Sequence, residues 1–336
     1  MTTSTPPTST ATPRDDTVPG AGGGIVGRVR EWPEFSIVLA LLALVVVFGA
    51  LKPNVFLTWD NINSILVAAA VLVVLAIGQT FVVVTAGIDL SINATLIFAA
   101  VLFGLMFKHG HGVALGIIVS LLGGLTVGII NGLVITRGKV TDFIATLGML
   151  SVATGLALLI SNAQPVTVFN KFFTDLATGS IGPIRYLVLI ALVVAVIAHI
   201  VLFHTRLGTH LLAVGGSREA ADDMGINTAR VKVIAYAVSG FLAGLGSIMV
   251  ISRIGAAEPQ AGTTLLLNSV AAVVLGGVSL FGGRGSIVGP VVGALILQTL
   301  INGLTISSVP VYWQPIAVGT VVVLSAIAFQ RREARA

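Results

Sequence analysis

Cysteine is absent from the 336-residue chain, which excludes disulfide frameworks, thiolate metal sites and cysteine nucleophiles. Charged residues make up only 9% of the sequence, and its five histidines form no H-x-x-H or H-E-x-x-H pair that would indicate a metal site. There is also no serine–histidine–carboxylate grouping and no pair of carboxylates within an apolar run. The sequence therefore predicts no catalytic residue, no metal and no cofactor.

Apolar residues and glycine are abundant instead. The chain is 56% hydrophobic and contains 39 glycines, and its mean hydropathy is +1.05. This amino-acid composition differs strongly from that of soluble globular proteins. The abundance of glycine fits a membrane protein, because small residues let membrane helices pack closely. The net charge of +5 is scattered over many loops, so it indicates membrane topology and no nucleic-acid partner. An all-α polytopic membrane protein is expected.

Ten apolar runs are long enough to cross a hydrocarbon core, which takes about 17 to 25 helical residues. They are 36–51, 62–86, 90–107, 113–135, 142–161, 186–203, 232–251, 265–281, 286–304 and 313–329. With the amino terminus inside, 13 of the 18 Lys and Arg residues fall on the inner side. Both termini are therefore predicted to be cytoplasmic.

The runs divide into two halves of five around the loop 162–185, which predicts two inverted five-helix halves. Residues 1–30 are rich in Thr, Ser, Pro and Gly and are expected to form a disordered cytoplasmic tail. Residues 31–336 form the transmembrane domain.

The most charged stretch, 204–232, carries seven charged side chains and is predicted to lie on the cytoplasmic side. Ser217 is placed to cap a two-turn helix that Gly225 closes in a left-handed conformation. Arg218 at its start and Asp222 and Asp223 at its end oppose the helix dipole, so local stability does not explain them. The stretch is either a docking surface or a solvated spacer. The docking residues are Gly215, Ser217, Arg218, Glu219, Ala220, Ala221, Asp222, Asp223, Met224 and Gly225.

A second polar group interrupts the apolar runs around Asp89, a carboxylate with no obvious cation nearby. One interpretation is a broken helix whose carboxylate lines a polar cavity. The other is a capped cytoplasmic turn. Later spans add amides that either bind substrate hydroxyls or join helices. The candidate pathway residues are Gln79, Asp89, Ser91, Asn93, Asn131, Asn268, Gln298 and Asn302.

The segment 275–290 is rich in glycine but lacks the G-x-x-x-x-G-K-[ST] pattern of a phosphate-binding loop. A tight turn between closely packed helices, with Arg284 facing the cytoplasm, is the preferred interpretation.

Four segments resemble the permease subunits of ATP-binding-cassette importers for sugars of the ribose, xylose and galactose type. They are Gly78–Ser91 with G-I-D-L-S, Asn131–Met149 with F-I-A-T-L-G-M, Ala213–Ala221 with Gly225-Ile-Asn, and Ala271–Gly285. The resemblance covers roughly residues 36 to 330. It implies a bacterial inner-membrane complex with a second permease subunit in a homodimer, cytoplasmic ATPase subunits and an extracytoplasmic sugar-binding protein. It also implies that 204–232 is the loop that docks on the ATPase.

The chain departs from that pattern in two places. Leu266 and Asn268 stand where many relatives have a glutamate and an aspartate, and Ala86 replaces the first glycine of G-G-I-D-L-S. The expected function is alternating-access import of a pentose or hexose, without an enzymatic activity of this chain's own. The rival from another class is an ion-coupled secondary transporter that uses Asp89, and such a carrier needs no inward-facing docking helix.

Overall fold

A computed structural model describes residues 35–260 and 264–333, so the predicted tail at 1–30 and the last residues lie outside the described chain. The long elements are α2 (Phe35–Leu51), α4 (Trp59–Val83), α5 (Ile92–Lys108), α6 (Gly112–Thr136), α7 (Asp142–Ser161), α9 (Tyr186–His204), α12 (Thr228–Ile254), α13 (Thr264–Leu275), α14 (Val288–Ile306) and α15 (Trp313–Glu333). The short ones are α3 (Pro53–Phe56), β1 (Val166–Thr167), α8 (Lys171–Thr178), β2 (Ser180–Ile181), β3 (Ile184–Arg185), α10 (Arg206–Gly216), α11 (Arg218–Asp223) and β4 (Ala256–Ala257).

Each predicted apolar run overlaps a helix. Within the described residues, six helices are long and apolar enough to cross a membrane: α4, α6, α7, α9, α12 and α14. The apolar parts of α2, α5, α13 and α15 are shorter, at 10 to 17 residues. The all-helical polytopic class is confirmed, whereas the count of ten spans stays a prediction.

The expected span 265–281 is wrong at its carboxyl end. The helix α13 stops at Leu275, because two glycines follow and Gly277 takes a left-handed φ of +72°. The rest of that run belongs to a turn that continues to residue 287, before α14. The expected span 62–86 is also too long, since α4 ends at Val83.

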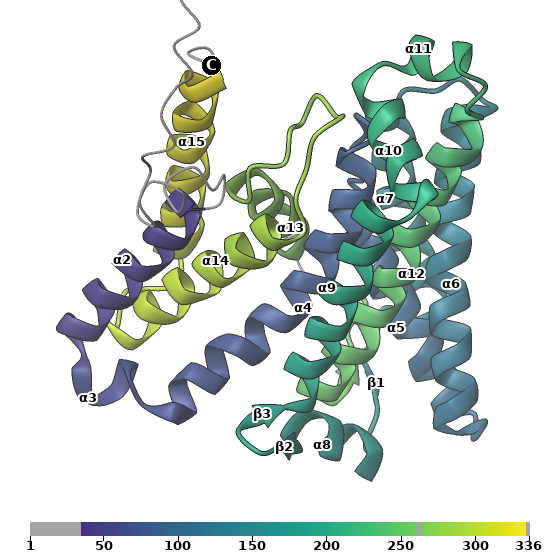
Figure 1. The fold of residues 1–336 in the computed structure, drawn as a ribbon. Coiled ribbons are helices and arrows are strands. Elements are labelled where there is room, and N and C mark those ends of the chain that lie inside the picture. The colour runs from purple at the N-terminus through teal and green to yellow at the C-terminus, as the bar shows by residue number, and fades with distance from the viewer. Residues whose placement is uncertain (1–34, 261–263, 334–336) are drawn as a thin grey trace, which may run out of the picture.

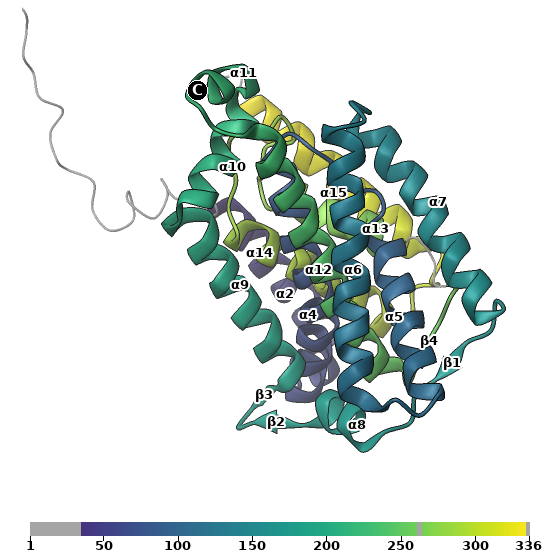
Figure 2. The same ribbon diagram turned by 90° about the vertical axis from the view of Figure 1, so that its right-hand side faces the viewer.

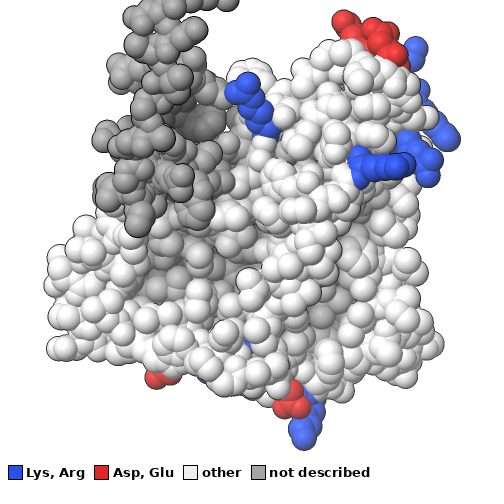
Figure 3. Space-filling model, viewed as in Figure 1, with Lys and Arg blue, Asp and Glu red and all other residues white. Residues whose placement is uncertain are grey.

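The helices α4 and α12 lie at the centre of the bundle and are the most buried of the six membrane-length helices. Helices α5, α6, α9 and α14 pack around them (Figures 1 and 2). By contrast, α7 and α9 expose large apolar side chains such as Leu159 and Val193. Charged side chains gather at the top and bottom of the face in Figure 3, with an almost uncharged band between. This distribution suits a bilayer-spanning bundle.

The two ends of the bundle differ. At the upper end in Figure 1 lie α10, α11 and the turn between α13 and α14. At the lower end, β1 pairs antiparallel with β4, with Val166 opposite Ala257. The amphipathic α8 lies there too, and its buried Phe173 packs edge-on against Phe103 of α5 at a centroid distance of 5.0 Å. Strands of two residues are too short to leave an alternating pattern, so the sequence did not predict them.

Helices α6 and α12 make the most extensive contact in the bundle, and glycine permits it. A Cβ on Gly124 would overlap the Gly240 carbonyl, and one on Gly240 would overlap the Gly124 carbonyl. A Cβ on Gly128 would overlap the Tyr236 carbonyl in the same way. Ser120 and Ser247 add a hydrogen bond of 2.7 Å across this contact. Small residues spaced four apart thus bring the two backbones together.

Gly240→Val is therefore expected to destabilise the protein by at least about 3 kcal/mol or to prevent folding, because backbone atoms of α6 cannot yield to a side chain. The matched control is Gly155→Val on α7, where a Cβ meets nothing within 4 Å. Thermal unfolding in detergent measures both variants. Equal melting temperatures for the two would contradict the close packing of α6 on α12.

Candidate functional site

The chain leaves the helical conformation between α4 and α5, at the position predicted for a broken helix. The 17-residue α5 is about 25 Å long at 1.5 Å per residue, shorter than a hydrocarbon core. Residues 84–91, between the two helices, are not helical. Ala86 takes a left-handed φ of 56°, a conformation that glycine adopts without strain.

Asp89 is the centre of a buried hydrogen-bond network. It is only 2% exposed. Its Oδ1 accepts from the Ser91 hydroxyl at 2.6 Å and from the Ser91 N–H at 3.0 Å. Its Oδ2 accepts from the Ser239 hydroxyl of α12 at 2.7 Å. Asn131 of α6 donates to the Ser91 hydroxyl at 2.8 Å. Three hydrogen bonds from two residues, Ser91 and Ser239, thus stabilise a carboxylate that has no ion-pair partner among the described residues.

The backbone of the same segment also bonds to side chains from neighbouring helices. The Ile88 carbonyl accepts from the Tyr236 hydroxyl at 3.1 Å and from the Thr146 hydroxyl at 3.3 Å. The Gln79 amide, oriented to satisfy both partners, donates to the Asp89 carbonyl and accepts from the Asp89 N–H, each at 3.2 Å. A non-helical segment at membrane depth needs such partners, because lipid offers none.

Asp89 has one feature of a capped turn, whereas the polar cavity of the other interpretation stays a prediction. The Asp89 carboxylate does accept from the backbone N–H of Ser91, directly before α5, as a capping residue does. The segment is nevertheless not a solvated turn, because Thr85, Gly87 and Ser91 are buried with it. The Oδ1 atom of Asn131 is buried there without a hydrogen-bond partner among the described residues, which leaves an acceptor facing the network.

The remaining pathway candidates lie on α5, α13 and α14. Asn93 lies on the first turn of α5 and is buried. Asn268 is buried on α13, and Gln298 is half-buried on α14. Asn302 donates to Asn61 of α4 at 2.9 Å, so it joins two helices. The sequence did not single out Ser239, Tyr236 and Thr146, because single hydroxyls in apolar helices are common and their partners lie 58 to 150 residues away.

Three backbone segments meet next to the network. The Gly283 N–H donates to the Val84 carbonyl at 3.0 Å, which holds the turn between α13 and α14 against the broken helix. A Cβ on Gly215 of α10 would overlap the Val84 carbonyl, and one on Gly282 would lie 2.7 Å from Ala86 N and from the Gly215 carbonyl. We call residues 84–86, 215–216 and 282–283 the glycine junction. The preferred interpretation of 275–290, a tight turn in close packing, agrees with this geometry.

Gly215→Ala is expected to push the glycine junction apart, lowering the free energy of unfolding by about 2 to 3 kcal/mol and impairing transport. Gly216→Ala is the matched control, because a Cβ there has its nearest neighbour, Gly283 Cα, at 4.0 Å. Unfolding midpoints and substrate uptake in cells are measured for both variants. If Gly215→Ala behaves like Gly216→Ala, the junction has no mechanical role.

The predicted capped helix is present as α11. The Ser217 hydroxyl accepts from the Ala220 N–H at 3.3 Å, and Gly225 follows with φ of +79°. Thr228, in the first turn of α12, donates to Asp222 Oδ1 at 2.7 Å and fixes α11 to that helix. Met224 is 83% exposed at the tip.

Two of the ten docking residues lie inside the protein. Gly215 belongs to α10, a helix that sequence analysis missed, and it is buried in the glycine junction. Ala221 is 3% exposed, because it is the face on which α11 packs. The exposed residues of the predicted docking surface, called the α11 surface below, are Ser217, Arg218, Glu219, Ala220, Asp222, Asp223, Met224 and Gly225.

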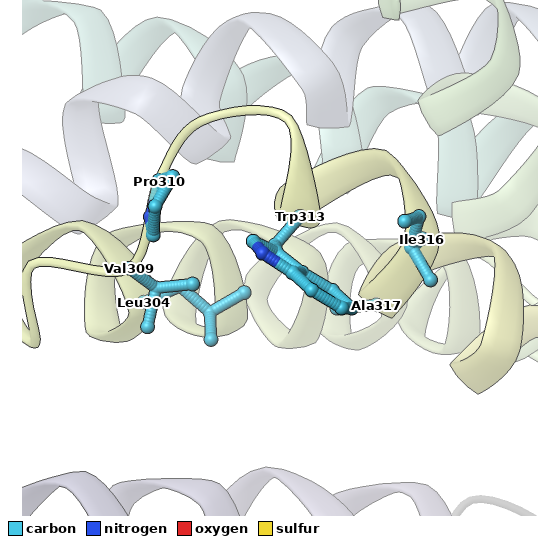
Figure 4. Close-up of a pocket in the computed structure, with 6 residues that line it drawn as sticks. All are labelled: Leu304, Val309, Pro310, Trp313, Ile316 and Ala317. Atoms are coloured by element: carbon cyan, nitrogen blue, oxygen red, sulfur yellow. The ribbon is translucent and has the colours of Figure 1, made fainter.

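A pocket of about 310 Å³ lies at the opposite end, where α14 passes into α15. Leu304 and Val309 lie on one side of the Trp313 ring and Ile316 on the other (Figure 4). Its lining is almost entirely apolar, so it lacks the hydrogen-bonding groups that a sugar needs.

This architecture, a helical bundle with a buried polar break and an exposed capped helix, defines a membrane transport component. Residues 61–326 match the family described as "Branched-chain amino acid transport system / permease component". The chain belongs to this family and is a multi-pass membrane protein.

Curated relatives match over nearly the whole chain. The chain is 36% identical to the ribose import permease protein RbsC of Escherichia coli K12, covering 89% of this chain and 94% of that protein. It is 38% identical to RbsC of Bacillus subtilis, over 88% and 92% of the two chains. It is 34% identical to the D-allose transport system permease protein AlsC of E. coli, over 89% and 92%. No solved structure matches the chain.

Proposed function

We propose that the chain is the permease subunit of an ATP-driven, binding-protein-dependent importer of a monosaccharide, a pentose or hexose. The observation that carries the proposal is the similarity across almost the full length to permeases named for ribose and allose, and to an L-arabinose permease. An ion-coupled carrier is not favoured, because these relatives are import permeases of a different transporter class. ATP is hydrolysed on a separate subunit, and this chain has no enzymatic role.

The proposed topology has ten spans, with both termini in the cytoplasm of a bacterial cell and the chain in its inner membrane. Helices α2, α4, α5, α6 and α7 form one half, and α9, α12, α13, α14 and α15 form the other. The order of helix lengths supports an inverted repeat: the long α4 and α12 occupy the second place in each half and pack on each other. The lysines and arginines near α11 support placing that end inside.

The proposed partners follow from this orientation. Cytoplasmic ATPase subunits dock on the α11 surface, a sugar-binding protein delivers substrate at the end with α8, and a second copy of the permease completes the pathway. Exposed apolar faces such as that of α9 contact the bilayer. The α11 surface combines exposed charge with an exposed methionine, as a docking surface requires.

In the proposed mechanism, closure of the ATPase pushes on α11, and α10 passes the displacement to the glycine junction. The junction includes Val84 and Ala86 of the broken helix, which lie five and three residues before Asp89. Movement there would rearrange the hydrogen bonds of Asp89, Ser91 and Asn131 and open the pathway on one side. The network stays a proposed part of the pathway, together with the other candidate amides.

Affinity purification of the tagged full-length chain from its native membrane tests the partners. The proposal expects an ATP-binding-cassette ATPase and a sugar-binding protein in the purified complex, with a pentose or hexose in the binding protein. A complex with another ligand class in the binding protein would overturn the sugar assignment but keep the transporter class. Purification without any ATPase would overturn the class itself.

A further inference from the structure

A pocket of about 410 Å³ lies at the α11 end of the bundle, between the turn that joins α6 to α7 and the starts of α11 and α12. Its walls carry three cations, Lys139, Arg218 and Lys232, and one acid, Asp142. Three segments, namely α11, α12 and the turn that leads into the first residue of α7, supply these residues, so the fold and not a local run of charge creates the cluster.

The pocket has surplus positive charge. Lys232 Nζ lies 2.7 Å from Asp142 Oδ2, so these two groups neutralise each other. Lys139 and Arg218 are exposed, and in the described chain no acid lies within ion-pair distance of either. Figure 3 shows acidic atoms at the top of this end and basic atoms along the flank below. Two uncompensated cations at one pocket favour an anionic ligand.

The backbone of the turn positions Lys139 in an unusual conformation. Lys139 has a left-handed φ of 55°, and it follows Gly138, where a Cβ would lie 2.5 Å from the Val134 carbonyl. A non-glycine residue at positive φ is uncommon, and such strain concentrates at ligand sites.

The surroundings of the pocket indicate what kind of anion it binds. Phe143 and Ile144 follow Asp142 directly at the start of α7 and are 56% and 61% exposed. Val134, near the end of α6, is 39% exposed. Apolar surface of two membrane-length helices thus begins close to the cationic pocket. The end of a membrane-spanning helix lies near the lipid headgroups. A soluble anion would contact only the cations of the pocket. A phospholipid would contact the cations through its phosphate and the apolar surface through its acyl chains.

We propose that this pocket binds the phosphate of an anionic phospholipid, with the acyl chains along Phe143 and Ile144. Lys139 and Arg218 supply the charge, and the Lys232–Asp142 pair forms the floor. The floor of the site adjoins the segment around Asp89, because a Cβ on Gly87 would lie 2.7 Å from Asp142 Oδ2. Arg218 also belongs to the α11 surface.

Native mass spectrometry of the full-length chain with added dioleoyl phosphatidylglycerol or dioleoyl phosphatidylcholine tests the proposal. Phosphatidylglycerol is expected to bind more tightly than phosphatidylcholine. The double variant Lys139→Gln with Arg218→Gln is expected to weaken phosphatidylglycerol binding about 30-fold. The matched control, Lys52→Gln with Lys171→Gln, removes two exposed lysines at the opposite end and should change nothing. An equal loss in both double variants, or no loss in either, would overturn the site.

Phe143→Ser separates a lipid from a soluble anion without changing charge. It is expected to weaken phosphatidylglycerol binding. Added glycerol 3-phosphate should displace the lipid only at concentrations at least about 100-fold above that of the lipid, since it lacks the apolar contacts. Displacement at equal concentration, together with unchanged binding to Phe143→Ser, would show a site for soluble anions and contradict the lipid proposal.

Discussion

Asp89→Asn is expected to lower uptake of the transported sugar by at least about 10-fold, equivalent to about 1.4 kcal/mol, while the protein stays folded. The asparagine oxygen can still accept from the Ser91 N–H, and its amide can face the Ser239 hydroxyl. The substitution therefore keeps the hydrogen-bond count and removes the buried charge. Uptake into cells carrying the complete transporter measures the effect.

The control for this variant is Asp60→Asn, an exposed carboxylate in the first turn of α4 at the opposite end of the bundle. Thermal unfolding of both proteins shows whether the fold is intact. Normal uptake with Asp89→Asn would reduce Asp89 to a cap of α5. If Asp89→Asn loses uptake and also has a lowered melting temperature, the role of Asp89 is structural.

Charge reversal on the α11 surface is expected to have the second large effect. Glu219→Lys with Asp223→Lys should weaken binding of the ATPase about 100-fold or more, because like charges brought together at an interface cost several kcal/mol. Asp222→Lys is added in a second variant, since Asp222 also bonds to Thr228 and its loss affects the fold. Copurification of the ATPase with the tagged permease is the measurement.

Asp175→Lys is the matched control, because this exposed acid lies on α8 at the other end. The control should keep its ATPase. If Glu219→Lys with Asp223→Lys also keeps a fully coupled ATPase, α11 is a spacer and the interpretation of its charges is wrong.

Local signals in the sequence predicted α11 well. Its cap at Ser217 and its stop at Gly225 depend only on residues within or next to the helix, so they are visible in the chain itself. The helix break at 84–91 was one of two interpretations of the segment around Asp89, because a carboxylate is rare inside a continuous membrane helix and a glycine beside it permits a turn. The end of α13 was misjudged although Gly276 and Gly277 marked it, because apolar residues continue beyond them.

The partners of the break were not predictable in the same way. Ser239 and Tyr236 contact residues about 150 positions earlier, and nothing near them in the apolar α12 distinguishes them. The packing of α6 on α12 did leave a signal, since Gly124, Gly128 and Gly132 on one helix and Gly240 and Gly244 on the other are spaced by four. That spacing predicts close helix approach but not which helices meet.

Uptake of labelled ribose, arabinose and allose into proteoliposomes that contain the permease with its ATPase and binding protein tests the central claim most directly. The account predicts uptake of at least one of these sugars that requires internal access to ATP and persists when proton and sodium gradients are collapsed. Uptake that continues without ATP and disappears with the gradient would contradict it and would favour an ion-coupled carrier.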